Sequence, residues 1–178
     1  MPPSDSARTH VEAEGVVMEA VFAREGDGVR VDYRIRNVGT VSRVVFDRGD
    51  RHAVLTRRQV SGDVGVPVLR EQPGRRATLS HVAHALPMPA PTLPPTPLAR
   101  RVEPGARADA TFRFSNWLVA TPAQVRWCVG IGIADDTRLS APDAQGEVEV
   151  WQADFGYAED QQVLCTPWFD MTSGTFET

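Results

Sequence analysis

The chain has 178 residues, of which 42% are hydrophobic and 24% are charged, and its formal net charge is −4. This length suits one domain with a substantial core, and no apolar run approaches the roughly 18 residues of a membrane span. We therefore expect one soluble domain without a transmembrane segment.

The charged residues are unevenly distributed. Residues 1–126 hold 18 Arg and 13 acidic residues, whereas residues 127–178 hold one Arg and 10 acidic residues. The acidic C-terminal third either folds against the Arg-bearing faces of earlier strands or, like those faces, is solvated surface. The negative net charge, with Arg residues strung along strands without interleaved aromatic residues, argues against nucleic-acid binding.

Residues 1–15 are polar and show no periodicity, so the sequence predicts a flexible leader followed by one domain over residues 16–178. No charged segment followed by an apolar segment marks a signal peptide. The chain is then either cytoplasmic or a mature form whose signal or lipoprotein anchor is not part of this sequence.

The clearest pattern lies in residues 29–46. Apolar and charged residues alternate strictly over residues 29–36, which is typical of a half-buried strand. Turn-forming residues 37–40 and a second β-branched run, residues 41–46, follow. We predict a β-hairpin here, with its apolar side covered by a second sheet.

Further short strands are predicted by alternation and by the turns between them. They span residues 16–22, 53–60, 66–71, 99–102, 108–114, 125–133 and 147–151, and a short apolar run follows at residues 163–165. Residues 79–98 include six prolines between Pro87 and Pro97, which excludes a helix or internal strand and predicts an extended crossing between sheet edges. A Pro-rich ligand segment for a partner is the alternative.

These features predict an all-β fold, an antiparallel immunoglobulin-like β-sandwich of seven or more strands with a long Pro-rich crossover. A closed barrel is the alternative. The segments VDYRIRNVGTVSRVVFDRG and RVEPGARADATFRF resemble bacterial envelope immunoglobulin-like modules. They are more loosely similar to the bacterial intracellular proteinase inhibitor family, a resemblance that implies inhibition only by fold analogy.

The sequence contains no phosphate-binding loop, nucleophile elbow, His-Glu-x-x-His or Cys-x-x-Cys motif, so we predict a non-enzymatic protein without a cofactor. His81, His84 and Met88 are weak candidates for a copper site, because their ligand types suit copper. A solvated pair of loop histidines is the alternative. The tripeptide Arg48-Gly49-Asp50 matches an adhesion motif that chance alone produces often.

Trp127 is expected in the core, while Trp117, Trp151 and Trp168 lie near strand ends or loops. Exposed aromatic rings can stack on sugars, which makes a carbohydrate-binding module another hypothesis. Closing the ends of the core is the alternative role.

Cys128 and Cys165 are predicted to form a disulfide. Val125, Trp127 and Val129 alternate onto the core face of their strand, so Cys128 points outward, beside Gly130 and Gly132. We expect residues 163–165 to lie across this face. Unpaired thiols in a reducing cytoplasm are the alternative.

Together these observations favour a periplasmic or cell-envelope β-sandwich with a binding or assembly role toward a protein partner. Proteinase inhibition, copper binding and sugar binding are the alternatives, and a cytoplasmic location is the alternative compartment.

Overall fold

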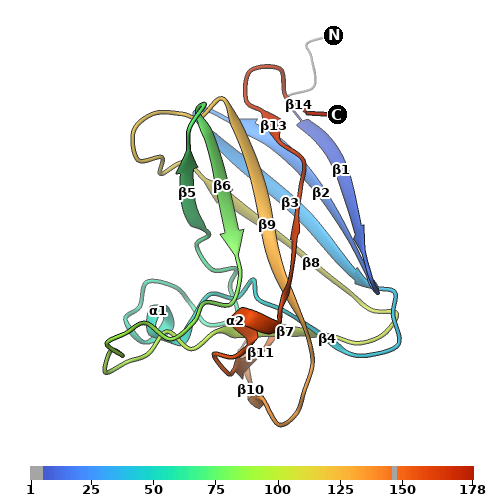
Figure 1. The fold of residues 1–178 in the computed structure, drawn as a ribbon, viewed down its shortest axis with the longest axis vertical. Coiled ribbons are helices and arrows are strands. Elements are labelled where there is room, and N and C mark those ends of the chain that lie inside the picture. Colours follow the sequence, from blue (N-terminus) through green and yellow to red (C-terminus); the bar gives the residue numbers. More distant parts are fainter. Residues whose placement is uncertain (1–5, 146–147) are drawn as a thin grey trace.

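The computed structural model describes residues 6–145 and 148–178 and shows two β-sheets packed face to face (Figure 1). The smaller sheet is antiparallel, with the strand order β1-β2-β3-β8. Its strands are β1 (Ser6–Ala13), β2 (Val16–Glu25), β3 (Gly28–Asn37) and β8 (Arg107–Phe114). The predicted all-β sandwich is therefore present.

The larger sheet is built around β9 (Gln124–Ile133) and follows the order β10-β11-β7-β4-β9-β13-β14. Its other strands on this path are β4 (Arg43–Val45), β7 (Leu98–Val102), β10 (Leu139–Gln145), β11 (Val148–Ala153), β13 (Phe169–Asp170) and β14 (Thr175–Phe176). Off this path lie β5 (Val68–Gln72), β6 (Arg76–His81) and β12 (Gln162–Cys165). The predicted antiparallel order is wrong in one place, because β6 runs parallel to β9.

The main core lies between the two sheets and is filled by the alternating residues of β2, β3, β8 and β9. Trp127 is fully buried there, with its ring centroid 4.4 Å from that of Tyr33. A second, smaller cluster includes Phe46 and Tyr157, whose rings lie 5.3 Å apart. β10, β11 and α2 (Tyr157–Asp160) lie at one end of the sandwich, at the bottom of Figure 1.

The predicted hairpin over residues 29–46 is wrong. β3 pairs with β2 and β8 in the smaller sheet, whereas β4 pairs with β7 and β9 in the larger one. The turn after β3 therefore carries the chain from one sheet to the other. Asn37 fixes this crossing: its buried side-chain amide donates to the carbonyls of Val41 and Val102, over 2.7 and 2.9 Å.

The predicted flexible leader is also wrong over residues 6–13, and residues 1–5 lie outside the described part of the chain. β1 pairs with β2 from Ser6 to Ala13 across a turn at Gly15. Its inward-facing residues Ala7, Val11 and Ala13 pack against the core. Their alternation is easily missed because only one of the three is a large apolar residue.

Residues 53–60 do not form the predicted strand, because a short helix, α1 (Arg51–Leu55), begins here. Asp50 caps it: its carboxylate Oδ1 accepts a hydrogen bond of 2.8 Å from the backbone N–H of Ala53. The described part of the chain contains no helix that is long and apolar enough to cross a membrane.

The Pro-rich segment connects β6 to β7, two strands of the larger sheet, and runs beside α1. Its later part is anchored to the loop before α1, since Leu98 N–H donates to the Gly49 carbonyl over 3.0 Å. Leu98 is buried, while Leu93 is largely exposed. The segment follows the edge of the domain.

The predicted disulfide is present: Cys128 and Cys165 are bonded, with Cα atoms 4.0 Å apart. The predicted position of residues 163–165 is wrong, because β12 pairs beside β9, with Cys165 opposite Cys128, rather than lying across its face. The small glycine face of β9 is instead covered by residues just before β12. A Cβ at Gly132 would lie 2.8 Å from Tyr157 Cε1.

The acidic C-terminal third contacts the Arg residues of the first 126 in places. Arg101 pairs with Asp136 over 2.8 Å, and Arg76 pairs with Glu177 over 3.5 Å. Many other Arg residues pair with acids of their own sheet, for example Arg34 with Asp109 over 2.9 Å. The acidic C-terminal third therefore contacts Arg residues of the earlier strands in some places, and elsewhere the charged residues of both regions are solvated surface.

Candidate functional site

A cavity of about 230 Å³ lies between the Pro-rich segment, the end of β6 and the start of β5. Its lining is mostly apolar and includes Phe46, Val66, Val68, Pro87, Pro95 and Pro97. We call it the proline cavity. A small, mostly apolar hollow with a few polar groups is typical of a site that accepts a single side chain or a small ligand.

Three polar residues from β6, the segment after it and the loop before α1 line the cavity besides His81. They are Ser80, His84 and Asp50. In the described part of the chain, neither the Ser80 nor the His84 side chain has a hydrogen-bond partner. These two groups are therefore available to a ligand, whereas Asp50 already caps α1 through Oδ1.

His81 also lines the cavity, but both of its ring nitrogens are engaged within the protein. Trp127 Nε1–H donates to His81 Nδ1 over 2.9 Å, and His81 Nε2 lies 2.6 Å from the Gly65 carbonyl oxygen. An indole N–H can only donate and a carbonyl can only accept, so the ring is the neutral tautomer protonated at Nε2. Burial lowers the pKa of His81.

The copper-site hypothesis therefore loses His81 as a ligand. His84 and Met88 are exposed and lie beyond the end of β6. Within residues 6–145 and 148–178, no group of three or more His, Cys, Asp or Glu side chains is placed to hold a metal ion. The copper hypothesis was based on the residue types and spacing of His81, His84 and Met88. Spacing alone does not show that both ring nitrogens of His81 are already hydrogen-bonded.

Asp47 and Arg48, which lie in the chain between the lining residues Phe46 and Gly49, form a buried ion pair that the sequence did not reveal. Arg48 Nε is 3.2 Å from Asp47 Oδ1, and both side chains are almost fully buried. Tyr33 from β3 donates its hydroxyl proton to Asp47 Oδ2 over 2.5 Å. Burial, followed by the charge of Asp47, raises the pKa of Tyr33 well above its ordinary value.

The same pair holds the segment of residues 61–67, whose Val66 lines the cavity. Gly65 N–H donates to the Asp47 carbonyl over 2.9 Å, and Arg48 Nη1 donates to the Gly62 carbonyl over 2.9 Å. The backbones of Gly49 and Gly65 touch: a Cβ at Gly65 would lie 2.5 Å from Gly49 Cα. The buried network thus positions the segment that carries Val66 into the lining of the cavity.

Burial of Arg48 also removes the adhesion reading of Arg48-Gly49-Asp50. The Arg48 side chain is only 4% exposed and pairs with Asp47, so it is not presented to a partner. Sequence reasoning assigned this stretch to a charged surface loop because two adjacent ionised residues are rarely buried together.

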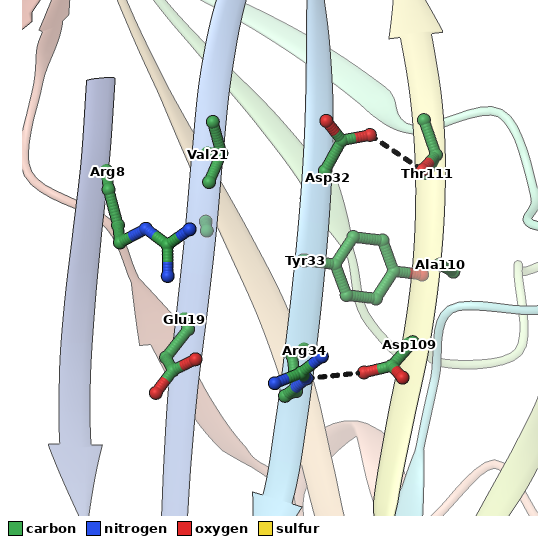
Figure 2. Close-up of a pocket in the computed structure, with 10 residues that line it drawn as sticks. Arg8, Glu19, Val21, Asp32, Tyr33, Arg34, Asp109, Ala110 and Thr111 are labelled. Carbon is green, nitrogen blue, oxygen red and sulfur yellow. Dashed lines mark hydrogen bonds and ion pairs between the residues drawn. The ribbon is translucent and has the colours of Figure 1, made fainter. Parts of the chain in front are cut away.

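A second hollow, of about 460 Å³, lies on the outer face of the smaller sheet (Figure 2). Figure 2 shows Arg34 and Asp109 pointing toward one another from β3 and β8. The Thr111 hydroxyl donates to Asp32 Oδ1 over 2.7 Å. Arg8 has no ion-pair partner among the described residues. Because most of its charged groups are satisfied by one another, this open face is the weaker candidate.

The tryptophan rings contact other side chains of the protein. Trp168 lies against the guanidinium groups of Arg76 and Arg126, 4.8 and 4.7 Å from the ring centroid. Arg101 covers the ring of Trp151 at 5.4 Å, and Trp117 packs on Phe114 at 4.9 Å. Trp127 is in the core. This arrangement gives no support to a platform for sugar stacking.

Comparisons with models of protein families, with curated proteins and with solved structures find no match. The chemistry of the site therefore rests on its geometry.

Proposed function

We propose that this protein is a non-enzymatic binding module of the bacterial cell envelope, with the proline cavity as the site that holds part of a protein partner. The observation that carries the proposal is the cavity itself. It is mostly apolar and is walled by three prolines that have no N–H of their own. The buried Asp47–Arg48 pair holds the segment that carries its lining residue Val66.

The edge of β5 adds to this proposal. β5 pairs with β6 on one side and with no other described strand, and Val66 and Val68 at the cavity rim are 72% and 50% exposed. Unpaired strand edges are places where extended segments of partner proteins add on. A partner segment bound along β5 would run past the mouth of the cavity.

The envelope part of the proposal rests on the disulfide between Cys128 and Cys165. Disulfides persist mainly in oxidising compartments such as the periplasm. The likeness to envelope immunoglobulin-like modules agrees with a sandwich used for binding, and the immunoglobulin-like topology remains part of the proposal.

Site-directed photo-crosslinking in the native host tests the proposal. A photoreactive residue at Val66 should give one dominant protein adduct, and the same residue at Val119, which is 90% exposed, should not. The adduct at Val66 should disappear when Ala85→Trp fills the cavity. No adduct at Val66, or the same adduct from both positions, would contradict a binding site here.

A further inference from the structure

Residues 61–67, whose Val66 lines the proline cavity, have no strand partner. They are held by the packing of Val64 against the core and by a few hydrogen bonds. From one side, the Asp47 carbonyl and the Arg48 guanidinium group hold Gly65 and Gly62. From the other side, His81 Nε2–H donates to the Gly65 carbonyl over 2.6 Å. Val66, the next residue, lines the cavity. The position of Val66 in the cavity lining therefore depends on the hydrogen bond between His81 and Gly65.

His81 can keep its place only while Nδ1 is unprotonated. This nitrogen accepts the Trp127 indole N–H over 2.9 Å, and a proton on Nδ1 would set two donors against each other. Protonation would remove that hydrogen bond and bury a positive charge on a residue that is 4% exposed.

Burial outweighs the two contacts that favour the charged His81 ring, which are the Gly65 carbonyl that accepts from Nε2–H and the negative charge of Asp47. Gly65 is therefore released only when the charged ring leaves its buried position. Asp47 is the nearest acid, but it is already engaged by Arg48 and by the Tyr33 hydroxyl. Arg48 is itself a cation beside the ring and opposes a second positive charge. Phe112 from β8 and Trp127 from β9, which pack against the ring, carry no charge.

We propose that His81 is a pH-sensitive switch: in acid its protonation releases residues 61–67 and opens the proline cavity. This regulation rests on the proposed function insofar as the open cavity would let a bound partner go. Near neutral pH the ring stays neutral and the cavity stays closed. Burial lowers the pKa of His81, so the neutral ring is favoured in the closed state and protonation favours the open state, in which the ring is hydrated.

Hydrogen exchange of the free protein, followed by NMR at pH 7.5 and pH 5.0, tests the switch without a partner. After correction for intrinsic rates, protection of the Gly65 amide should fall at least tenfold more on acidification than that of Ile35 in β3. His10→Gln, a change at an exposed histidine on β1, should leave this difference unchanged. His81→Gln should abolish it.

A second readout covers the case in which His81→Gln fails to fold. The ¹⁵N shifts of the wild-type His81 ring should show the neutral Nε2–H tautomer at pH 7.5, and its protonation should coincide with the loss of Gly65 protection. Equal protection of Gly65 relative to Ile35 at both pH values would overturn the switch. That result would not affect the crosslinking test of the cavity. Conversely, the absence of a crosslinked adduct at Val66 would contradict the binding site without contradicting the pH switch.

Discussion

The Tyr33 hydroxyl on β3 donates to the Asp47 carboxylate, which follows β4, and so joins the two sheets by a hydrogen bond of 2.5 Å inside the core. Asp47 also carries the charge that neutralises buried Arg48. Asp47→Asn keeps the shape of the side chain but leaves the Arg48 guanidinium group uncompensated. We expect the free energy of unfolding, measured with urea, to fall by about 3–5 kcal/mol.

Asp32→Asn is the matched control for this change. Asp32 lies on the outer face of the smaller sheet, accepts from Thr111 and is 42% exposed (Figure 2). Its loss should cost less than about 1 kcal/mol, because solvent screens exposed pairs. Equal costs for the two variants would show that the Asp47–Arg48 pair is not desolvated.

The loss of folding stability at alkaline pH should depend on the ionisation of Tyr33. The chain has no Lys, and both cysteines are disulfide-bonded, so its side chains that titrate near pH 10 are the two tyrosines. The pKa of Tyr33 is raised in the folded protein, so its contribution to stability is complete below the ordinary value of 10.0 and is lost as pH rises toward the folded pKa.

Absorbance at 295 nm measures this titration, because tyrosinate absorbs there. One of the two tyrosines should ionise only when the protein unfolds, in a single cooperative step above pH 10. Tyr33→Phe should remove that step and retain the ionisation of Tyr157. Two independent ionisations below the unfolding transition would contradict the buried Tyr33–Asp47 bond.

The disulfide between Cys128 and Cys165 should contribute strongly to stability, because it closes a loop with a sequence separation of 37. The chain-entropy relation gives about 4 kcal/mol for such a loop. The Cys128→Ala/Cys165→Ala variant should lose most of this free energy of unfolding and become insensitive to reductant. Two free thiols counted in the unfolded, unreduced wild type would show instead that the bond does not form in the cell.

Gly132→Ala tests how closely α2 approaches β9. The added methyl group would lie 2.8 Å from Tyr157 Cε1 and 3.3 Å from Val44 Cγ2, and the tyrosine ring cannot move aside easily. We expect a cost of about 1–3 kcal/mol in the free energy of unfolding. In a Tyr157→Ala background the same substitution should cost little, and equal costs in both backgrounds would contradict the contact.

Local alternation predicted most strands, including β2, β3, β8 and β9, because each buries one face and exposes the other. Alternation predicted the wrong structure where the pairing of a segment depends on residues far away in the sequence. The turn after Asn37 looks like a hairpin turn, yet the carbonyl of Val102 holds that side chain at a crossing between sheets. β1 was missed because its buried residues are mostly small.

The candidate site was less accessible to sequence reasoning than the strands. The Pro-rich segment and His81 were both noticed, but the sequence offered His81 and His84 only as weak candidates for a metal site or as a solvated pair. Only the position of Trp127, one strand away, shows that His81 Nδ1 is already occupied. Asp47 and Arg48 looked like loop charges because the network that buries them comes from β3 and from residues 61–67.

The most direct test of the account is the affinity of the crosslinked partner, once purified, for two matched variants that each place a Trp in one of the two hollows. Ala85→Trp fills the proline cavity, and Val21→Trp fills the hollow on the outer face of the smaller sheet. Isothermal titration at pH 7.5 should give a Kd at least tenfold weaker for Ala85→Trp and unchanged for Val21→Trp. The reverse order, or no change for Ala85→Trp, would contradict the proline cavity as the binding site.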